Sequence, residues 1–318
     1  MGIAKFVVRR LLLGVLTLFI VSVVVFALTQ ALGDPVRAIL GREAQPESVL
    51  AKREELGLTR PVLTQYWSWL TGLVTGDPGT SFTNGVPVLD VLGDRIWNSL
   101  FLMAISAAVS IPISIAVGTY AAARRDKPFD SASSAGSLVL ASMPEFVTGL
   151  LLIVLLATNV WQVFPAVVRI RPGEPPWVQP SALVLPVLTL TLGVIPYVSR
   201  VMRASMIEVL ESDYIEMARL KGLPERTVVW RHALPNAIGP ALQVIAINIA
   251  YLAGGVIVVE NIFNFPGIGL ALRDAVTDVN VPVVQFIAML IAAIYVIVNL
   301  LADVGTILVT PRLRTGLR

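Results

Sequence analysis

Residues 213–224 read DYIEMARLKGLP, and this short run predicts a helix with its own start and stop. Asp213 suits the N-cap, and Glu216 follows three residues later, as in a capping box. Gly222 suits the left-handed residue that ends a helix, and Pro224 prevents the helix from continuing. The run therefore predicts a capped helix of about three turns.

Four residues are predicted to share one face of this helix, since residues three and four apart are neighbours: Tyr214, Met217, Ala218 and Lys221. The small side chain of Ala218 is expected to let a partner surface approach closely. A second helix is predicted to start near Pro224 and to meet Pro235.

The run lies in a polar segment, residues 200–235, between two of six long stretches with little or no charge. The stretches are residues 11–33, 96–123, 131–168, 175–199, 233–259 and 279–302. About 20 apolar residues suffice for a helix to cross a bilayer. We expect six transmembrane helices, including the first, which is longer than the apolar region of a typical signal peptide.

The composition agrees with a membrane protein. Hydrophobic residues make up 56% of the chain and charged residues 14%, whereas soluble domains carry about 25% charged residues. Lipid is therefore the expected environment for much of the surface. The net charge of +3 does not indicate nucleic acid as a partner, and the absence of cysteine together with a single histidine, His232, excludes thiolate and histidine-cluster metal sites.

The basic residues predict the orientation, because lysine and arginine gather on the cytoplasmic side. With the N-terminus inside, 15 of the 24 lie in inner segments, and the short outer loops hold only Arg169, Arg171 and Arg273. Both termini are therefore expected to be cytoplasmic. Asp303, near the inner end of the last span, is expected to pair with a nearby arginine.

The long outer segment, residues 34–95, is expected to form an extracytoplasmic loop subdomain. Residues 46–56 predict a short helix that stops at Gly57, and residues 61–74 predict a second helix with an apolar face. That second helix either lies on the membrane surface or packs on other outer loops, and the sequence leaves both open.

Glu145 stands within the third apolar stretch, directly after Pro144. A carboxylate in a span costs at least ~2.5 kcal/mol on insertion scales, so it is expected to face a cavity or a partner. Pro144 is expected to open the helix locally. One reading places Glu145 on a conduit, where it attracts a peptide's amino terminus. The other makes it an intersubunit salt bridge, or a protonated side chain buried between helices.

The spacing of Glu216, Met217, Ala218, Gly222 and then Leu234-Pro235 resembles the EAA loop of importer permeases of the ATP-binding-cassette (ABC) superfamily. Met217 stands where that family usually has alanine. A basic loop that merely lies on lipid headgroups would need no such spacing.

Other segments resemble the dipeptide and oligopeptide branch of these permeases. They are Gly33-Asp34-Pro35, Leu56-Gly57-Leu58, Gly76-Asp77, Val86-Pro87-Val88, Glu260-Asn261-Ile262-Phe263, Pro266-Gly267-Ile268-Gly269 and Thr310-Pro311-Arg312. The resemblance covers essentially residues 1–318, so it implies a single all-α permease domain with the type I ABC importer fold.

The resemblance also implies an assembly in the bacterial cytoplasmic membrane. The partners are a second homologous permease, two ATP-binding-cassette subunits that carry ATP and Mg, and an extracytoplasmic binding protein that delivers a di- or oligopeptide. The residues that would contact an ATPase subunit are Asp213, Tyr214, Glu216, Met217, Ala218, Arg219, Lys221, Gly222, Leu234 and Pro235. The turn at Pro266, Gly267 and Gly269, with Glu260 and Phe263, is expected to border an outer gate; a plain connector between spans is the alternative.

This chain is not expected to be an enzyme or to hold a cofactor itself, since it has no Gly-x4-Gly-Lys-Ser/Thr phosphate loop. Nickel-chelate and glutathione importers are alternatives within the same family. A secondary transporter would need inverted repeats and ionisable residues at the membrane midplane, where only Glu145 qualifies. An intramembrane enzyme would need a catalytic pair inside the spans, which the sequence lacks.

Overall fold

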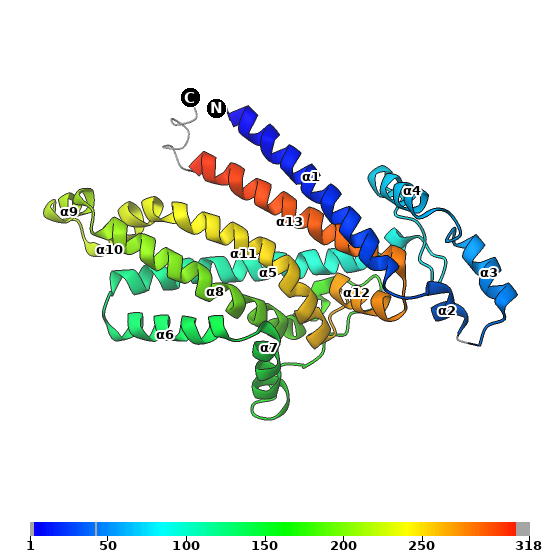
Figure 1. The fold of residues 1–318 in the computed structure, drawn as a ribbon. Coiled ribbons are helices and arrows are strands. Elements are labelled where there is room, and N and C mark those ends of the chain that lie inside the picture. Colours follow the sequence, from blue (N-terminus) through cyan, green and yellow to red (C-terminus); the bar gives the residue numbers. More distant parts are fainter. Residues whose placement is uncertain (1–2, 42, 310–318) are drawn as a thin grey trace.

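The computed structural model describes residues 3–41 and 43–309, which are almost entirely helical (Figure 1). The long helices are α1 Ile3–Gln30, α5 Val88–Ala123, α8 Pro180–Leu210, α11 Leu234–Phe263 and α13 Val281–Val309. The shorter α-helices are α2 Pro35–Leu40, α3 Pro46–Glu55, α4 Val62–Thr75, α6 Pro128–Ser142, α7 Glu145–Ile153, α9 Asp213–Leu220, α10 Glu225–Thr227 and α12 Ile268–Thr277. Two π-helical turns, Val154–Thr158 and Val228–Ala233, and one 3-10 turn, Pro176–Val178, complete the described elements.

Six membrane spans agree with these helices, although one of the six is broken. Five helices are long and apolar enough to cross a bilayer, and α6 with α7 makes the sixth if the bent pair counts as one span. The all-α integral membrane fold predicted from the sequence is confirmed in that form.

The expectation of one helix through residues 131–168 is wrong. The chain bends by 105° between α6 and α7. Met143 is extended, with φ −90° and ψ 129°, because the ring of the following proline disfavours helical backbone there, and Pro144 has no N–H to donate. Helical structure then stops at Thr158, so the last ten residues of the stretch are irregular.

Two spans are longer than their uncharged stretches. Helix α5 begins at Val88, so the last eight residues of the outer segment 34–95 belong to a span. Helix α8 continues to Leu210, so the polar segment 200–235 begins as a helical extension of the fourth span. The polar ends of both helices therefore project beyond the apolar layer as rigid structure.

Helices α5, α8 and α11 form the centre of the molecule, and their shared core includes Leu102, Leu190 and Val256. Helix α5 approaches α8 closely at Gly118. A Cβ atom at this position would lie 2.5 Å from the carbonyl oxygen of Ser199, so only glycine fits. Small residues permit such close backbone packing between membrane helices.

Helices α1 and α13 lie side by side at the edge of this core (Figure 1). The expected partner of Asp303 is Arg10, whose Nε lies 2.9 Å from the carboxylate, so that expectation is confirmed. The start of α1 and the end of α13 lie at the same end of the molecule as α9, and α2 to α4 lie at the other end. This arrangement agrees with both termini being cytoplasmic; residues 310–318, with Thr310-Pro311-Arg312, lie outside the described part.

The outer segment begins with an N-cap that also forms an ion pair. Asp34 accepts a hydrogen bond from the backbone N–H of Val36, and Arg53 of α3 lies 2.7 Å from its carboxylate. Partial burial alone would raise the pKa of Asp34, but the hydrogen bond and charge of Arg53 outweigh it and hold the pKa below its usual value. The predicted stop at Gly57 is confirmed by its φ of +68°.

Helix α4 packs on a membrane span with one side and is exposed on the other. Tyr66 is buried against Phe26 of α1, and its hydroxyl lies 2.9 Å from that of Ser22. Leu63, in contrast, is 74% exposed, and Trp67 is also exposed. The helix is therefore anchored to α1 rather than only to other outer loops.

Gly118→Ala is expected to destabilise the purified chain by about 1–3 kcal/mol, because the added methyl group overpacks the contact between α5 and α8. The matched control is Gly93→Ala in the same helix, where an added Cβ meets nothing within 4 Å. That control should be neutral or slightly stabilising, since alanine favours helices. Thermal unfolding in detergent measures both, and equal melting temperatures for the two variants would contradict the assignment.

Candidate functional site

Helix α9 lies at one end of the molecule, where the chain turns between α8 and α11 (Figure 1). The N-cap is Ser212, and Asp213 is the first helical residue, so the prediction of Asp213 as cap is wrong. No side chain caps this end, because the Ser212 hydroxyl donates back to the carbonyl of Val209. The helix has 8 residues, about two turns rather than three.

The underside of α9 is fixed to the membrane helices. Ile215 and Ala218 are buried in a cluster with Met202 and Met206 of α8 and with Ala237 of α11. Ala218 therefore packs inward, and the expectation that it admits a partner surface is wrong. The reason is the register of the two turns, which places positions 215 and 218 together against the core.

The outer side of α9 is an exposed apolar surface. Its members are Tyr214, Met217 and Leu220, with Lys221 and Glu216 at its margin, and all five are exposed. Met217, for example, is 55% exposed. An exposed apolar surface on a helix whose other side is fixed by packing is suited to contact another protein.

The chain leaves α9 through a fixed turn. Gly222 has a φ of +76°, which confirms the predicted left-handed stop. Arg219 donates to Glu225 over 2.7 Å and to the carbonyl of Leu210 over 3.3 Å. The hydrogen bond with Glu225 raises the pKa of the Arg219 guanidinium above its usual value. These bonds join α8, α9 and α10, so the turn is braced on both sides.

The prediction of a second helix that starts near Pro224 and meets Pro235 is confirmed, and this helix continues without a break into the fifth span. Helix α10 passes through the π turn Val228–Ala233 directly into α11, of which Leu234 and Pro235 are the first residues. A proline inside a regular α-helix lacks a donor and clashes with the carbonyl four residues earlier. The wider π turn before Pro235 accommodates this, so the helix continues without a break from α10 into α11.

A second group of predicted residues surrounds Glu260 near the outer end of α11. Glu260 is fully buried, and its carboxylate accepts hydrogen bonds from the Ser99 hydroxyl of α5 and, over 2.6 Å, from the N–H of Gly269. Ser99 also accepts from the N–H of Ile268 over 2.8 Å. A Cβ at Gly267 would collide with the Glu260 carboxylate and the Ser99 hydroxyl. We call Glu260, Ser99, Gly267 and Gly269 the Glu260 cluster.

The remaining residues of the predicted gate lie beside this cluster. Phe263 is fully buried, and its carbonyl accepts from the N–H of Val168. The carbonyl of Pro266 accepts from Asn98 of α5 over 2.9 Å. The structure thus brings the predicted gate residues together in a hydrogen-bonded turn that joins α11, α12 and α5. Whether this turn borders a gate stays a prediction.

Glu145 begins α7 at the sharp bend, and its carboxylate lies between two glycines. A Cβ at Gly193 of α8 would lie 3.1 Å from Oε1, and a Cβ at Gly255 of α11 would lie 2.7 Å from Oε2. Oε1 is buried and has no hydrogen-bond partner among the described residues. The structure therefore places an unsatisfied carboxylate between the two central helices, where a cationic group would be stabilised.

Aromatic hydroxyls adjoin this carboxylate. Tyr251, one helical turn before Gly255, lies beside Glu145, and Tyr197 of α8 is close to Tyr251. Tyr197 is 46% and Tyr251 48% exposed. Sequence reasoning singled out neither tyrosine nor Gly193 and Gly255, because Gly193 and Tyr197 lie in one apolar stretch, Tyr251 and Gly255 in another, and no local motif links the two stretches to Glu145.

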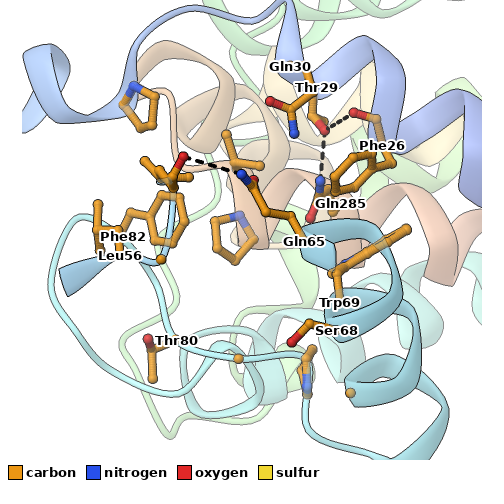
Figure 2. Close-up of a pocket in the computed structure, with 18 of the residues that line it drawn as sticks. Phe26, Thr29, Gln30, Leu56, Gln65, Ser68, Trp69, Thr80, Phe82 and Gln285 are labelled. Atoms are coloured by element: carbon orange, nitrogen blue, oxygen red, sulfur yellow. Dashed lines mark hydrogen bonds between the residues drawn. The ribbon is translucent and has the colours of Figure 1, made fainter. Parts of the chain in front are cut away.

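A pocket of about 350 Å³ opens at the outer end between α1, α4 and α13 (Figure 2). Gln65 donates to the carbonyl of Arg60 over 2.8 Å, and Gln285 donates to Thr29 over 2.8 Å. The side-chain amides of Gln65 and Gln285 thus form hydrogen bonds within the chain. We therefore interpret the pocket as part of the packing between the outer subdomain and the spans, not as a ligand site. Among the described residues, no group of three or more His, Cys, Asp or Glu side chains could hold a metal ion.

Comparisons with known proteins agree with this architecture. The family model described as "Binding-protein-dependent transport system inner membrane component" matches residues 114–315, and its N-terminal companion matches residues 3–103. The chain is 36% identical over 97% of its length to a probable peptide ABC transporter permease of Sinorhizobium fredii, which it covers to 99%. It is also 36% identical over 98% of its length to the glutathione transport system permease of Escherichia coli, again covering 99% of it.

Ser99→Ala is expected to destabilise the chain by about 1–3 kcal/mol, because Glu260 loses a donor and the N–H of Ile268 loses an acceptor in a buried site. The matched control is Ser106→Ala in the same helix, since the Ser106 hydroxyl is buried without a partner in the described structure. Its removal should be neutral or stabilising. Thermal unfolding in detergent compares the two, and an equal loss in both variants would argue against the Glu260 cluster.

Proposed function

Since this chain belongs to the family of binding-protein-dependent transport system inner membrane components, we propose that it passes small peptides through the bacterial cytoplasmic membrane. The chain is a permease subunit of an ABC importer and a multi-pass protein of the inner membrane. Its proposed partners are a second homologous permease, two ATPase subunits and an extracytoplasmic binding protein that delivers the substrate.

The observation that supports the proposal is that α9 has one exposed apolar side and one buried side. Tyr214, Met217 and Leu220 are exposed at the cytoplasmic end, whereas Ile215 and Ala218 are buried against α8 and the π turn that leads into α11. A partner that binds the exposed side therefore acts on two spans through a packed contact. An ATPase subunit that moves during its cycle would shift α8 and α11 in this way, which is the coupling between distant sites that active transport requires.

ATP and Mg belong to the partner subunits in this proposal, because the chain has no phosphate-binding loop. The proposed role of this chain is to bind an ATPase subunit, to change conformation with it and to line half of the translocation path. The path is proposed to include Glu145, whose carboxylate lies between α8 and α11 and whose Oε1 has no hydrogen-bond partner among the described residues.

Peptides are the first candidate substrate, and glutathione is the second. Similarity supports both, since one relative is named as a probable peptide permease and another as a glutathione permease, at 36% identity each. Both substrates carry an amine and a carboxylate, so both suit a path that contains a carboxylate receptor for the amine. The binding protein is expected to choose between them.

The double variant Tyr214→Ala/Met217→Ala is expected to weaken association with the ATPase subunits at least about tenfold, since buried anchor side chains at interfaces contribute ~1–2 kcal/mol each. Co-purification and stimulated ATP hydrolysis measure this loss. The control is Leu63→Ala/Trp67→Ala, which removes similar exposed apolar surface from the opposite end of the molecule. Unchanged co-purification in the first variant, or an equal loss in the control, would refute α9 as the contact.

Proteoliposomes that hold the complete importer test the substrate. With ATP inside and the cognate binding protein outside, radiolabelled dialanine is expected to accumulate, and ATP removal should stop it. Accumulation of glutathione but not of dialanine would favour the second candidate. If neither compound accumulates while the complex hydrolyses ATP in response to its binding protein, the proposed substrate class is wrong.

A further inference from the structure

Two groups of opposite charge lie along one face of α8: the Glu145 carboxylate of α7 and the Arg200 guanidinium. The Glu145 carboxylate lies directly over Gly193 of α8, at the contact described above. Tyr197 and Arg200 follow Gly193 by four and seven residues, so all three lie on the same side of the helix. Tyr197 and Arg200 are both exposed, which leaves this side open to a ligand.

Arg200 occupies a polar recess at the cytoplasmic end of this face. A pocket of about 250 Å³ between α5, α6 and α8 is lined by Arg200 together with Ser134, Ser137 and Ser199. Arg203, one turn further along, is committed to Asp130, with its Nη2 2.7 Å from that carboxylate. Arg200 forms no ion pair within residues 3–41 and 43–309, so its charge is available for an anion.

The distance along α8 between Gly193 and Arg200 suits a short ligand. Seven helical residues separate Gly193 from Arg200, which is about 10 Å along the axis. An extended peptide spans about 3.4 Å per residue, so its amino and carboxyl termini are about 10 Å apart in a tripeptide. The exposed Tyr197 lies between these two positions on α8, and its hydroxyl can donate to a backbone carbonyl.

We propose that the face of α8 from Gly193 to Arg200 is a receptor for a short zwitterionic peptide, with Glu145 binding the amine and Arg200 the terminal carboxylate. The proposal rests on the proposed function and adds to it the orientation of the ligand, with its amine toward the outer side. Glutathione, itself a tripeptide with a free amine and free carboxylates, meets the same requirement.

Uptake of radiolabelled trialanine by the complete importer tests this receptor. Glu145→Gln and Arg200→Gln are each expected to lower uptake about tenfold or more, because each removes a charge-assisted hydrogen bond to the ligand. ATP hydrolysis stimulated by the loaded binding protein should persist, since α9 is unchanged. Arg124→Gln is the matched control, as Arg124 is exposed at the same end and stacks on Tyr120 outside the receptor, so its uptake should equal that of wild type.

A photo-crosslinking residue in place of Tyr197 supplies an independent measurement. During ATP-driven uptake it should capture labelled trialanine, whereas the same residue in place of the exposed Phe19 on α1 should not. Uptake within twofold of wild type in both charge variants, or no capture at position 197 during active transport, overturns the receptor. A parallel fall of uptake and stimulated ATP hydrolysis also overturns it, because the residues would then act on the whole complex. A wild-type importer that takes up no peptide at all overturns the proposed function itself.

Discussion

The bend at Pro144 is the constraint on which the proposed path depends. Proline removes one backbone donor and forces Met143 out of the helical conformation, so α7 leaves the line of α6 at 105°. The bend brings the Glu145 carboxylate between α8 and α11. Glycine at positions 193 and 255 leaves room for it there, since an added Cβ would lie 3.1 Å and 2.7 Å from its oxygens.

Helices α8 and α11 also connect the Glu145 carboxylate with α9, the proposed contact for an ATPase subunit. Ile215 and Ala218 of α9 belong to one buried cluster with Met202 and Met206 of α8 and with Ala237 of α11, which α9 meets through the π turn Val228–Ala233. Gly193 and Gly255 lie further along these two helices, one in each. Since a helix transmits displacement along its axis better than a loop does, a movement of α9 reaches the neighbourhood of Glu145 through continuous helical backbone. The π turn before Pro235 preserves that continuity in α11.

The carboxylates of Glu260 and Glu145 have opposite surroundings. Glu260 receives donors from Ser99 and from the N–H of Gly269, so its polar requirements are met within the chain and it stabilises the outer turn. Glu145 has an oxygen without a partner in the described structure. Burial of an unpaired carboxylate is costly, and a cationic ligand would remove that cost. This contrast separates a structural acid from a candidate binding acid, although both stand in apolar segments of the sequence.

The sequence by itself determined the membrane class, the number of spans, the orientation and the family, because apolar length, basic residues near span ends and local motifs are properties of neighbouring residues. It also determined the stop at Gly222 and the pairing of Asp303 with an arginine. The opening of the helix at Pro144 was likewise predicted from the sequence, whereas only the tertiary structure decided that Ala218 faces inward and that Glu145 meets Gly193, Gly255 and Tyr251. Those outcomes depend on which helices pack together, because packing brings together residues from different helices that share no local pattern, such as Glu145 and Gly255 at 110 positions apart.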